Sequence, residues 1–170
     1  INFTVLRELV DYHLAKHVTG FYICGSTGEG AFQSTEERLK ITETVMERVN
    51  GRVPVIVHVG ASAINESVRL AQHAADMGAA GVSSIVPPVV YNPAGVGPFL
   101  EKIAASAPSL PFFPYLFGGS INSLALLKEL AHIPNFVGTK YFGPNMYDMG
   151  QIAAFRGENW TVFSGMDEQA

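Results

Sequence analysis

Short apolar, β-prone segments recur along the chain, and each of the first five is followed by a loop and a helical pattern. The segments begin roughly 24 to 32 residues apart, which is the length of one strand–helix unit. They cover residues 21–24, 53–59, 81–86, 111–115, 136–140 and 161–164. Regular alternation of this kind predicts a parallel sheet with its helices on the outside.

The main helical patterns cover residues 3–16, 34–49, 65–77, 122–132 and 145–156. The first precedes all six predicted strands, so we expect a further strand upstream of Ile1. A sheet of this kind closes at eight strands. The predicted fold class is therefore α/β, a (β/α)8 TIM barrel that is incomplete here. Residues 1–170 would form a single partial barrel domain without the first strand and without the region after strand seven.

One further expectation follows from the barrel. Its inward side chains include Val55, Val57, Ile85 and Val137, and an incomplete wall would leave them partly exposed. The structural alternative is a Rossmann-type open sheet. The sequence carries no Gly-x-Gly-x-x-Gly fingerprint after a predicted strand, and this disfavours the alternative.

The composition suits a buried parallel sheet. Charged residues make up only 15% of the chain, against about 25% in an average soluble domain. Prolines interrupt both long uncharged stretches, 77–100 and 103–127, so neither predicts a membrane-spanning helix. The net charge of −4 and the lack of a basic stripe argue against nucleic-acid binding. Cys24 is the single cysteine and we expect no signal peptide, so the sequence favours a cytoplasmic protein.

Lys140 ends the fifth predicted strand and Tyr115 ends the fourth, at the edge where catalytic side chains of βα barrels gather. Burial would lower the pKa of Lys140, and a neutral amine can attack a ketone to form an imine. Alternatively, Lys140 only extends to solvent at the rim. Tyr115 is either a proton shuttle or a hydrogen-bonded core aromatic. His58 lies within a strand and is expected to be a hydrogen-bonded core or rim residue, and the histidine spacing indicates no metal site.

Two other polar segments follow predicted strands. A glycine-rich turn at residues 25–30 offers backbone N–H groups and the hydroxyls of Ser26 and Thr27 to an anion, or it is simply a tight strand-to-helix turn. Asp167 and Glu168 either bind substrate hydroxyls or form an exposed acidic turn.

Several of these segments resemble one protein family. Gly-Ser-Thr-Gly-Glu at 25–29 resembles the Gly-Ser/Thr-Thr-Gly-Glu motif of the dihydrodipicolinate synthase and N-acetylneuraminate lyase superfamily, which there holds a keto acid carboxylate. Gly-Thr-Lys at 138–140 resembles its Schiff-base segment, and Tyr115 falls on its catalytic tyrosine. The resemblance covers essentially the whole chain. Segments 55–61, 70–75, 135–141, 147–151 and 165–169 look like the N-acetylneuraminate lyase branch.

The resemblance implies a class I aldolase that cleaves N-acetylneuraminate to N-acetylmannosamine and pyruvate, with no metal or organic cofactor. It implies catalytic roles for Lys140 and Tyr115. The residues implied to bind substrate are Ser26, Thr27, Gly165, Asp167 and Glu168. Family members are usually homotetramers, and Tyr91 resembles a tyrosine that lies near the site at a subunit contact.

The chain also departs from the family pattern. Phe142 stands two residues past the lysine, where the lyases usually carry Ser or Thr. Leu116, Phe117 and Gly118 follow the tyrosine in place of a polar residue, Ile and Pro. One side of the predicted pocket is therefore unusually apolar. The alternatives are another pyruvate-dependent aldolase or dehydratase of the superfamily, of the 2-keto-3-deoxy acid or dihydrodipicolinate synthase type, and a non-catalytic paralogue or fragment.

Overall fold

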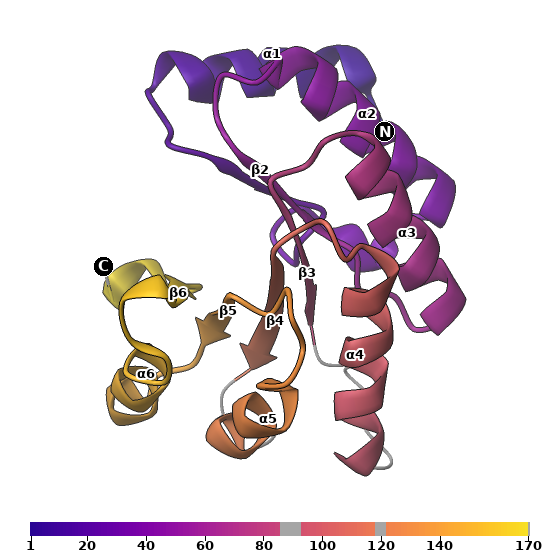
Figure 1. Cartoon of the computed structure of the whole chain (residues 1–170). Helices are drawn as coiled ribbons and strands as arrows, with labels where there is room; N and C mark the ends of the chain where they lie inside the picture. The colour runs from indigo at the N-terminus through magenta and orange to yellow at the C-terminus, as the bar shows by residue number, and fades with distance from the viewer. Residues whose placement is uncertain (86–92, 118–121, 170) are drawn as a thin grey trace.

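The computed structural model describes residues 1–85, 93–117 and 122–169. Six parallel strands form one sheet in sequence order, from β1 to β6. Residues of both β1 and β6 line one cavity, so the sheet is curled into a partial barrel, and the helices pack on its convex face (Figure 1). The predicted α/β fold class is therefore confirmed. No helix among the described residues is long and apolar enough to cross a membrane.

The strands are β1 (Phe21–Ile23), β2 (Val55–His58), β3 (Gly81–Ile85), β4 (Phe112–Phe117), β5 (Gly138–Phe142) and β6 (Thr161–Ser164). The α-helices are α1 (Phe3–Ala15), α2 (Thr35–Val49), α3 (Ile64–Asp76), α4 (Val96–Ser106), α5 (Ser123–Leu130) and α6 (Met146–Ala153). Short 3-10 turns cover Gly30–Phe32, Pro93–Gly95, Gly157–Asn159 and Asp167–Gln169.

Helix starts follow from local side-chain chemistry. Ser34 forms a capping box at the start of α2, because its hydroxyl accepts from the N–H of Glu37 while the Glu37 carboxylate accepts from the N–H of Ser34. Asn122 and Asn145 cap α5 and α6 by their side chains alone, accepting one backbone N–H at Asn122 and two at Asn145. These caps fix where each helix leaves the sheet edge.

The core lies between the sheet and the helices. Val55 and Val57 of β2 are 2% and 1% exposed and belong to one buried cluster with Leu70 and Ala74 of α3. The expectation of a partly exposed side chain is therefore wrong for Val55 and Val57, whereas Ile85 and Val137 are partly exposed. Side chains alternate along a strand, and Ile56, between Val55 and Val57, lines the interior cavity instead.

Strands β4 and β5 run two residues further than the sequence predicts. Leu116 pairs with Tyr141, and Phe117 pairs with Phe142. Leu116 and Tyr141 are both fully buried in the helix-facing core, so extending the pairing is favourable. As a consequence, Tyr115 and Lys140 lie inside their strands rather than at the ends.

Candidate active site

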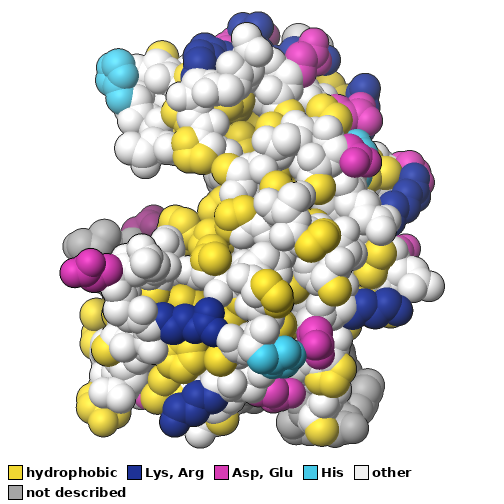
Figure 2. Space-filling model, viewed as in Figure 1, with side chains coloured by type: hydrophobic (Ala, Val, Ile, Leu, Met, Phe, Trp, Pro, Cys, Tyr) yellow, Lys and Arg dark blue, Asp and Glu magenta, His cyan; other side chains and the backbone are white. Residues whose placement is uncertain are grey.

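The concave side of the sheet holds a cavity of about 480 Å³, visible as the hollow at the left of Figure 2. Its wall combines Tyr22 of β1, the turn from Gly25 to Gly28, Lys140 of β5, and residues at the end of β6. Segments far apart in the sequence thus meet at one place. The sequence predicted this convergence from strand order alone.

Lys140 extends from β5 into this space. Its Nζ atom lies 4.4 Å from the ring centre of Tyr22 and 4.2 Å from that of Tyr115. Tyr115 is brought there because it is the register partner of Lys140 on β4. Burial lowers the pKa of the Lys140 amine, since a charged ammonium loses hydration there. The site therefore shifts this lysine toward the neutral form that acts as a nucleophile.

The glycine-rich turn begins directly after β1. Backbone hydrogen bonds of 3.0 Å from Gly30 to Gly25 and from Glu29 to Ser26 close it. A Cβ on Gly30 would lie 2.0 Å from the Cys24 carbonyl oxygen, so only glycine permits this close approach. Ser26 and Thr27 are exposed and line the cavity, so their hydroxyls are available to a bound anion.

Tyr115 links the turn to the lysine. Its side chain hydrogen-bonds to that of Ser26, and its ring lies over the Lys140 amine. Burial raises the pKa of the Tyr115 hydroxyl, and the Ser26 hydrogen bond opposes part of that rise. The phenol therefore keeps its proton near neutral pH and can donate it.

His58 lies beside the site but is not among the residues that line the cavity. Its Nε2 accepts the N–H of Ile85 on β3 at 3.0 Å, and its ring also hydrogen-bonds to the backbone of Cys24. Burial, with added repulsion from Arg38 and Lys140, lowers the pKa of His58 to about 3. The prediction of a hydrogen-bonded core histidine is confirmed.

Arg38 is a buried residue that the sequence reasoning missed. It is 3% exposed and donates hydrogen bonds to the backbone carbonyl of His58, the last residue of β2, and to that of Gly60 just beyond it. It also contacts the Cys24 thiol at the end of β1. Its position on the inner face of α2 was the available signal, because a charged residue there must find partners.

The other predicted residues divide into three groups. Gly165 and Asp167 line the cavity. Glu168 is exposed and is not part of the lining among the described residues. Tyr91 falls outside the described residues. Tyr22 was not predicted, although alternation along β1 places it on the cavity side. Within the described ranges, no group of three or more His, Cys, Asp or Glu side chains could hold a metal ion.

These features define a class of protein: a parallel βα barrel wall that presents one half-buried lysine amine at its carboxyl edge. The sequence model of the Dihydrodipicolinate synthetase family matches residues 1–170. The chain belongs to this family.

Individual relatives agree with that assignment. The chain is 36% identical to human N-acetylneuraminate lyase and 33% identical to the zebrafish (Danio rerio) enzyme of the same name, with 99% of the chain covered in each case. It spans 56% and 58% of the length of these two relatives.

Solved structures give the same result. A Ruminococcus gnavus sialic acid aldolase superposes with a TM-score of 0.95 at 30% identity, covering 99% of this chain and 57% of that one. A dihydrodipicolinate synthase from Aquifex aeolicus superposes with a TM-score of 0.89 at 29% identity, covering 98% of this chain and 58% of that one.

Proposed function

We propose that the protein is a class I aldolase that cleaves N-acetylneuraminate to N-acetylmannosamine and pyruvate through an imine on Lys140. The observation that carries this proposal is the position of the Lys140 amine between two tyrosine rings, in a cavity that also contains the hydroxyl-bearing turn. The relatives named N-acetylneuraminate lyase support the choice of substrate.

In the proposed reaction, the neutral amine of Lys140 attacks the C2 ketone of the open-chain sugar acid and water leaves, forming an iminium. The iminium accepts the electron pair of the C3–C4 bond as that bond breaks. The C4 hydroxyl passes its proton to the Tyr115 oxygen, directly or by way of the substrate carboxylate, while Tyr115 gives up its own phenol proton toward C3, and C4 becomes the aldehyde. The remaining enamine is protonated at C3, and hydrolysis then releases pyruvate and the free amine.

The polar residues after β1 and after β6 determine how the substrate is proposed to lie in the cavity. Ser26 and Thr27 are proposed to hold the carboxylate, which places C2 close to the lysine. Asp167 and Glu168 are proposed to accept hydrogen bonds from the distal hydroxyls, with Gly165 leaving room beside the amine. The reaction needs no metal or organic cofactor, because the lysine imine supplies the electron sink.

Borohydride reduction in the presence of pyruvate tests the imine. The peptide that contains Lys140 should gain the mass of the reduced adduct, and Lys140→Ala should abolish the gain. Lys128→Ala, which removes an exposed lysine on α5, is the matched control and should retain it. An adduct on any other lysine, or none in the wild-type protein, would overturn the proposed mechanism.

A second candidate is cleavage of a different 2-keto-3-deoxy acid by the same imine chemistry. The stacked rings of Phe117 and Phe142 favour it, because Phe142 and Lys140 both lie against Gly165. The superposition on a dihydrodipicolinate synthase also favours it. Product analysis on several keto acids distinguishes the two candidates, because each substrate releases pyruvate with a different aldehyde.

We further propose that the protein works as a cytoplasmic homotetramer. The free, buried thiol of Cys24 is compatible with a reducing compartment. Sedimentation analysis should give the mass of four chains, and a monomer would contradict the proposal.

A further inference from the structure

Side chains of β4, β5 and β6 form two successive layers on the concave face of the sheet. Side chains alternate along each strand, and register partners in a parallel sheet point to the same face. Tyr115, Lys140 and Phe163 are register partners, so they form the layer that holds the amine. Two residues further along, Phe117 pairs with Phe142. The layer next to the amine, toward the carboxyl edge, therefore contains two phenyl rings.

These two rings, which we call the phenyl pair, form a continuous apolar surface. The rings of Phe117 and Phe142 are stacked, with centroids 5.1 Å apart and planes inclined by 27°. Phe117 is 45% exposed, so the surface is accessible. It lies close to the reacting group, because a Cβ on Gly165 would come within 3.1 Å of Phe142 Cβ and within 3.2 Å of Lys140 Cε.

Imine formation decides which part of a substrate reaches the phenyl pair. The imine fixes C2 at the Lys140 amine, and the proposed carboxylate site at Ser26 and Thr27 lies on the β1 side. C1 and C3 leave C2 in different directions, so with the carboxylate on the β1 side we expect C3 and the carbons beyond it to extend toward β4, β5 and β6. The aldehyde half of the substrate therefore meets phenyl surface.

We propose a further activity that rests on the Lys140 imine of the proposed function: reversible addition of pyruvate to aromatic aldehydes, with the phenyl pair as the binding surface for the aldehyde ring. An aromatic ring gains stacking contact there, whereas a chain of hydroxyls would lose hydrogen bonds to water without replacement. Asp167 lines the cavity beyond Gly165 and stays available to a hydroxylated substrate, so this activity is additional to sugar acid cleavage.

The bond-forming step is balanced by groups already in the site. The enamine carbon C3 attacks the aldehyde carbon, and the π electrons of the carbonyl move to its oxygen. That oxygen takes a proton from the Tyr115 hydroxyl. Water then hydrolyses the iminium, which frees the amine and releases a 4-hydroxy-2-oxo acid that carries an aryl group at C4.

The test compares two acceptor aldehydes, benzaldehyde and glyceraldehyde, with pyruvate as the common donor. The measured quantity is the ratio of the kcat/KM value for benzaldehyde to that for glyceraldehyde. The intrinsic reactivity of each aldehyde is the same for every variant, so it cancels when the ratios of two variants are compared. We expect Phe142→Thr to lower the benzaldehyde-to-glyceraldehyde ratio by roughly tenfold, from the loss of ring contact and the gain of a hydroxyl. Phe117→Thr should act in the same direction, and Phe142→Leu should give an intermediate ratio.

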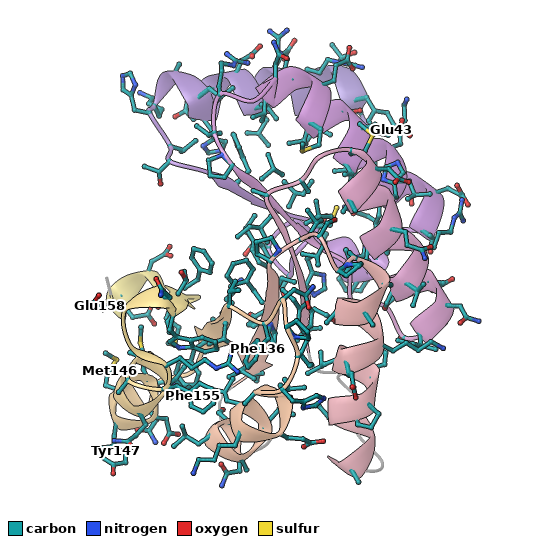
Figure 3. The ribbon with its side chains drawn as sticks, in the orientation of Figure 1. Glu43, Phe136, Met146, Tyr147, Phe155 and Glu158 are labelled. Carbon is teal, nitrogen blue, oxygen red and sulfur yellow. The ribbon has the colours of Figure 1, made fainter. Side chains whose placement is uncertain are left out.

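Tyr147→Thr is the matched control. Tyr147 is 75% exposed on α6 and points away from the sheet, with Met146 beside it (Figure 3). Removing an aromatic ring there should leave the ratio unchanged.

Borohydride trapping with pyruvate tests the proposed function separately from the aromatic-aldehyde activity. A wild-type protein without an adduct on Lys140 would refute the proposed function, and the aldehyde activity with it. If wild type and variants form the adduct but the ratio is the same in Phe142→Thr, Phe117→Thr and wild type, the phenyl pair does not bind the aldehyde and this inference is wrong. Should Phe142→Thr fail to form the adduct, Phe117→Thr and Phe142→Leu decide the outcome by the same criterion.

Discussion

Acidification should destabilise the protein mainly through His58. The pKa of this buried histidine is about 3 in the folded protein, against 6.5 for an unperturbed imidazole. Below about pH 6.5 His58 is therefore protonated in the unfolded chain but stays neutral in the folded protein. As a result, the free energy of unfolding falls as the pH falls toward 3. The difference of about 3.5 pH units corresponds to about 5 kcal/mol in total. Because a whole domain is stable by only about 5–15 kcal/mol, this one residue can determine the acid limit of the fold.

The magnitude has a structural cause. Protonation would remove the lone pair on Nε2 that accepts the Ile85 N–H, and would place a charge near Arg38 and Lys140. Urea unfolding at about pH 7 and about pH 5 measures the effect. Between these two pH values, the free energy of unfolding of the wild-type protein should fall by about 2 kcal/mol more than that of His58→Gln. The glutamine side chain can accept the same N–H but does not titrate.

Subtraction of the two proteins isolates His58, because both contain the other four histidines. Equal losses of stability in wild type and His58→Gln would refute the reasoning. So would an imidazole pKa near 6.5 for His58, measured by NMR on the folded protein.

Three further predictions concern the amine and its neighbours. The rate of borohydride-trapped imine formation with pyruvate should rise with pH as Lys140 loses its proton, with a midpoint below the ordinary lysine value of about 10.4, and a midpoint at that value would show that burial does not act on the amine. Tyr115→Phe should still form the pyruvate adduct while carbon–carbon cleavage falls by about 10²–10⁴-fold, and normal cleavage would remove Tyr115 from the mechanism. Phe142→Thr should increase cleavage of N-acetylneuraminate by up to about tenfold, from one restored hydrogen bond, and unchanged or lower cleavage would mean that Phe142 is not a damaged sugar-binding position.

Strand order and the convergence of polar residues were predictable from the sequence, because both follow from local patterns repeated along the chain. The spacing of apolar segments located all six strands, and capping residues located the starts of α2 and α5. The bounds of helix α4 were not among those predicted. The sequence also placed Lys140 beside Tyr115, since both were expected at the same sheet edge. These contacts required only that neighbouring strands be parallel.

Features that depend on register were not predictable. The sequence did not show that β4 and β5 continue to Phe117 and Phe142, because strand length is decided by which side chains find partners across the ladder. It did not reveal Tyr22 as the second ring around the lysine, since β1 and β5 are not neighbours in the sheet. The inner orientation assigned to Val55 and Val57 failed for the same reason: a shift of one residue exchanges the two faces of a strand.

The alternation along each strand separates the residues that hold the fold from those that meet a ligand. On β4, Phe112 and Leu116 are fully buried against helices, while Tyr115 and Phe117 point to the opposite, concave face with Lys140 and Phe142. Adjacent positions in one strand are therefore constrained by different requirements, core packing at one position and ligand contact at the next. Mutational tolerance should vary with a period of two along the strand. Positions on the concave face can then be varied, by evolution or in a directed library, to change substrate preference while the helix-facing core is left intact.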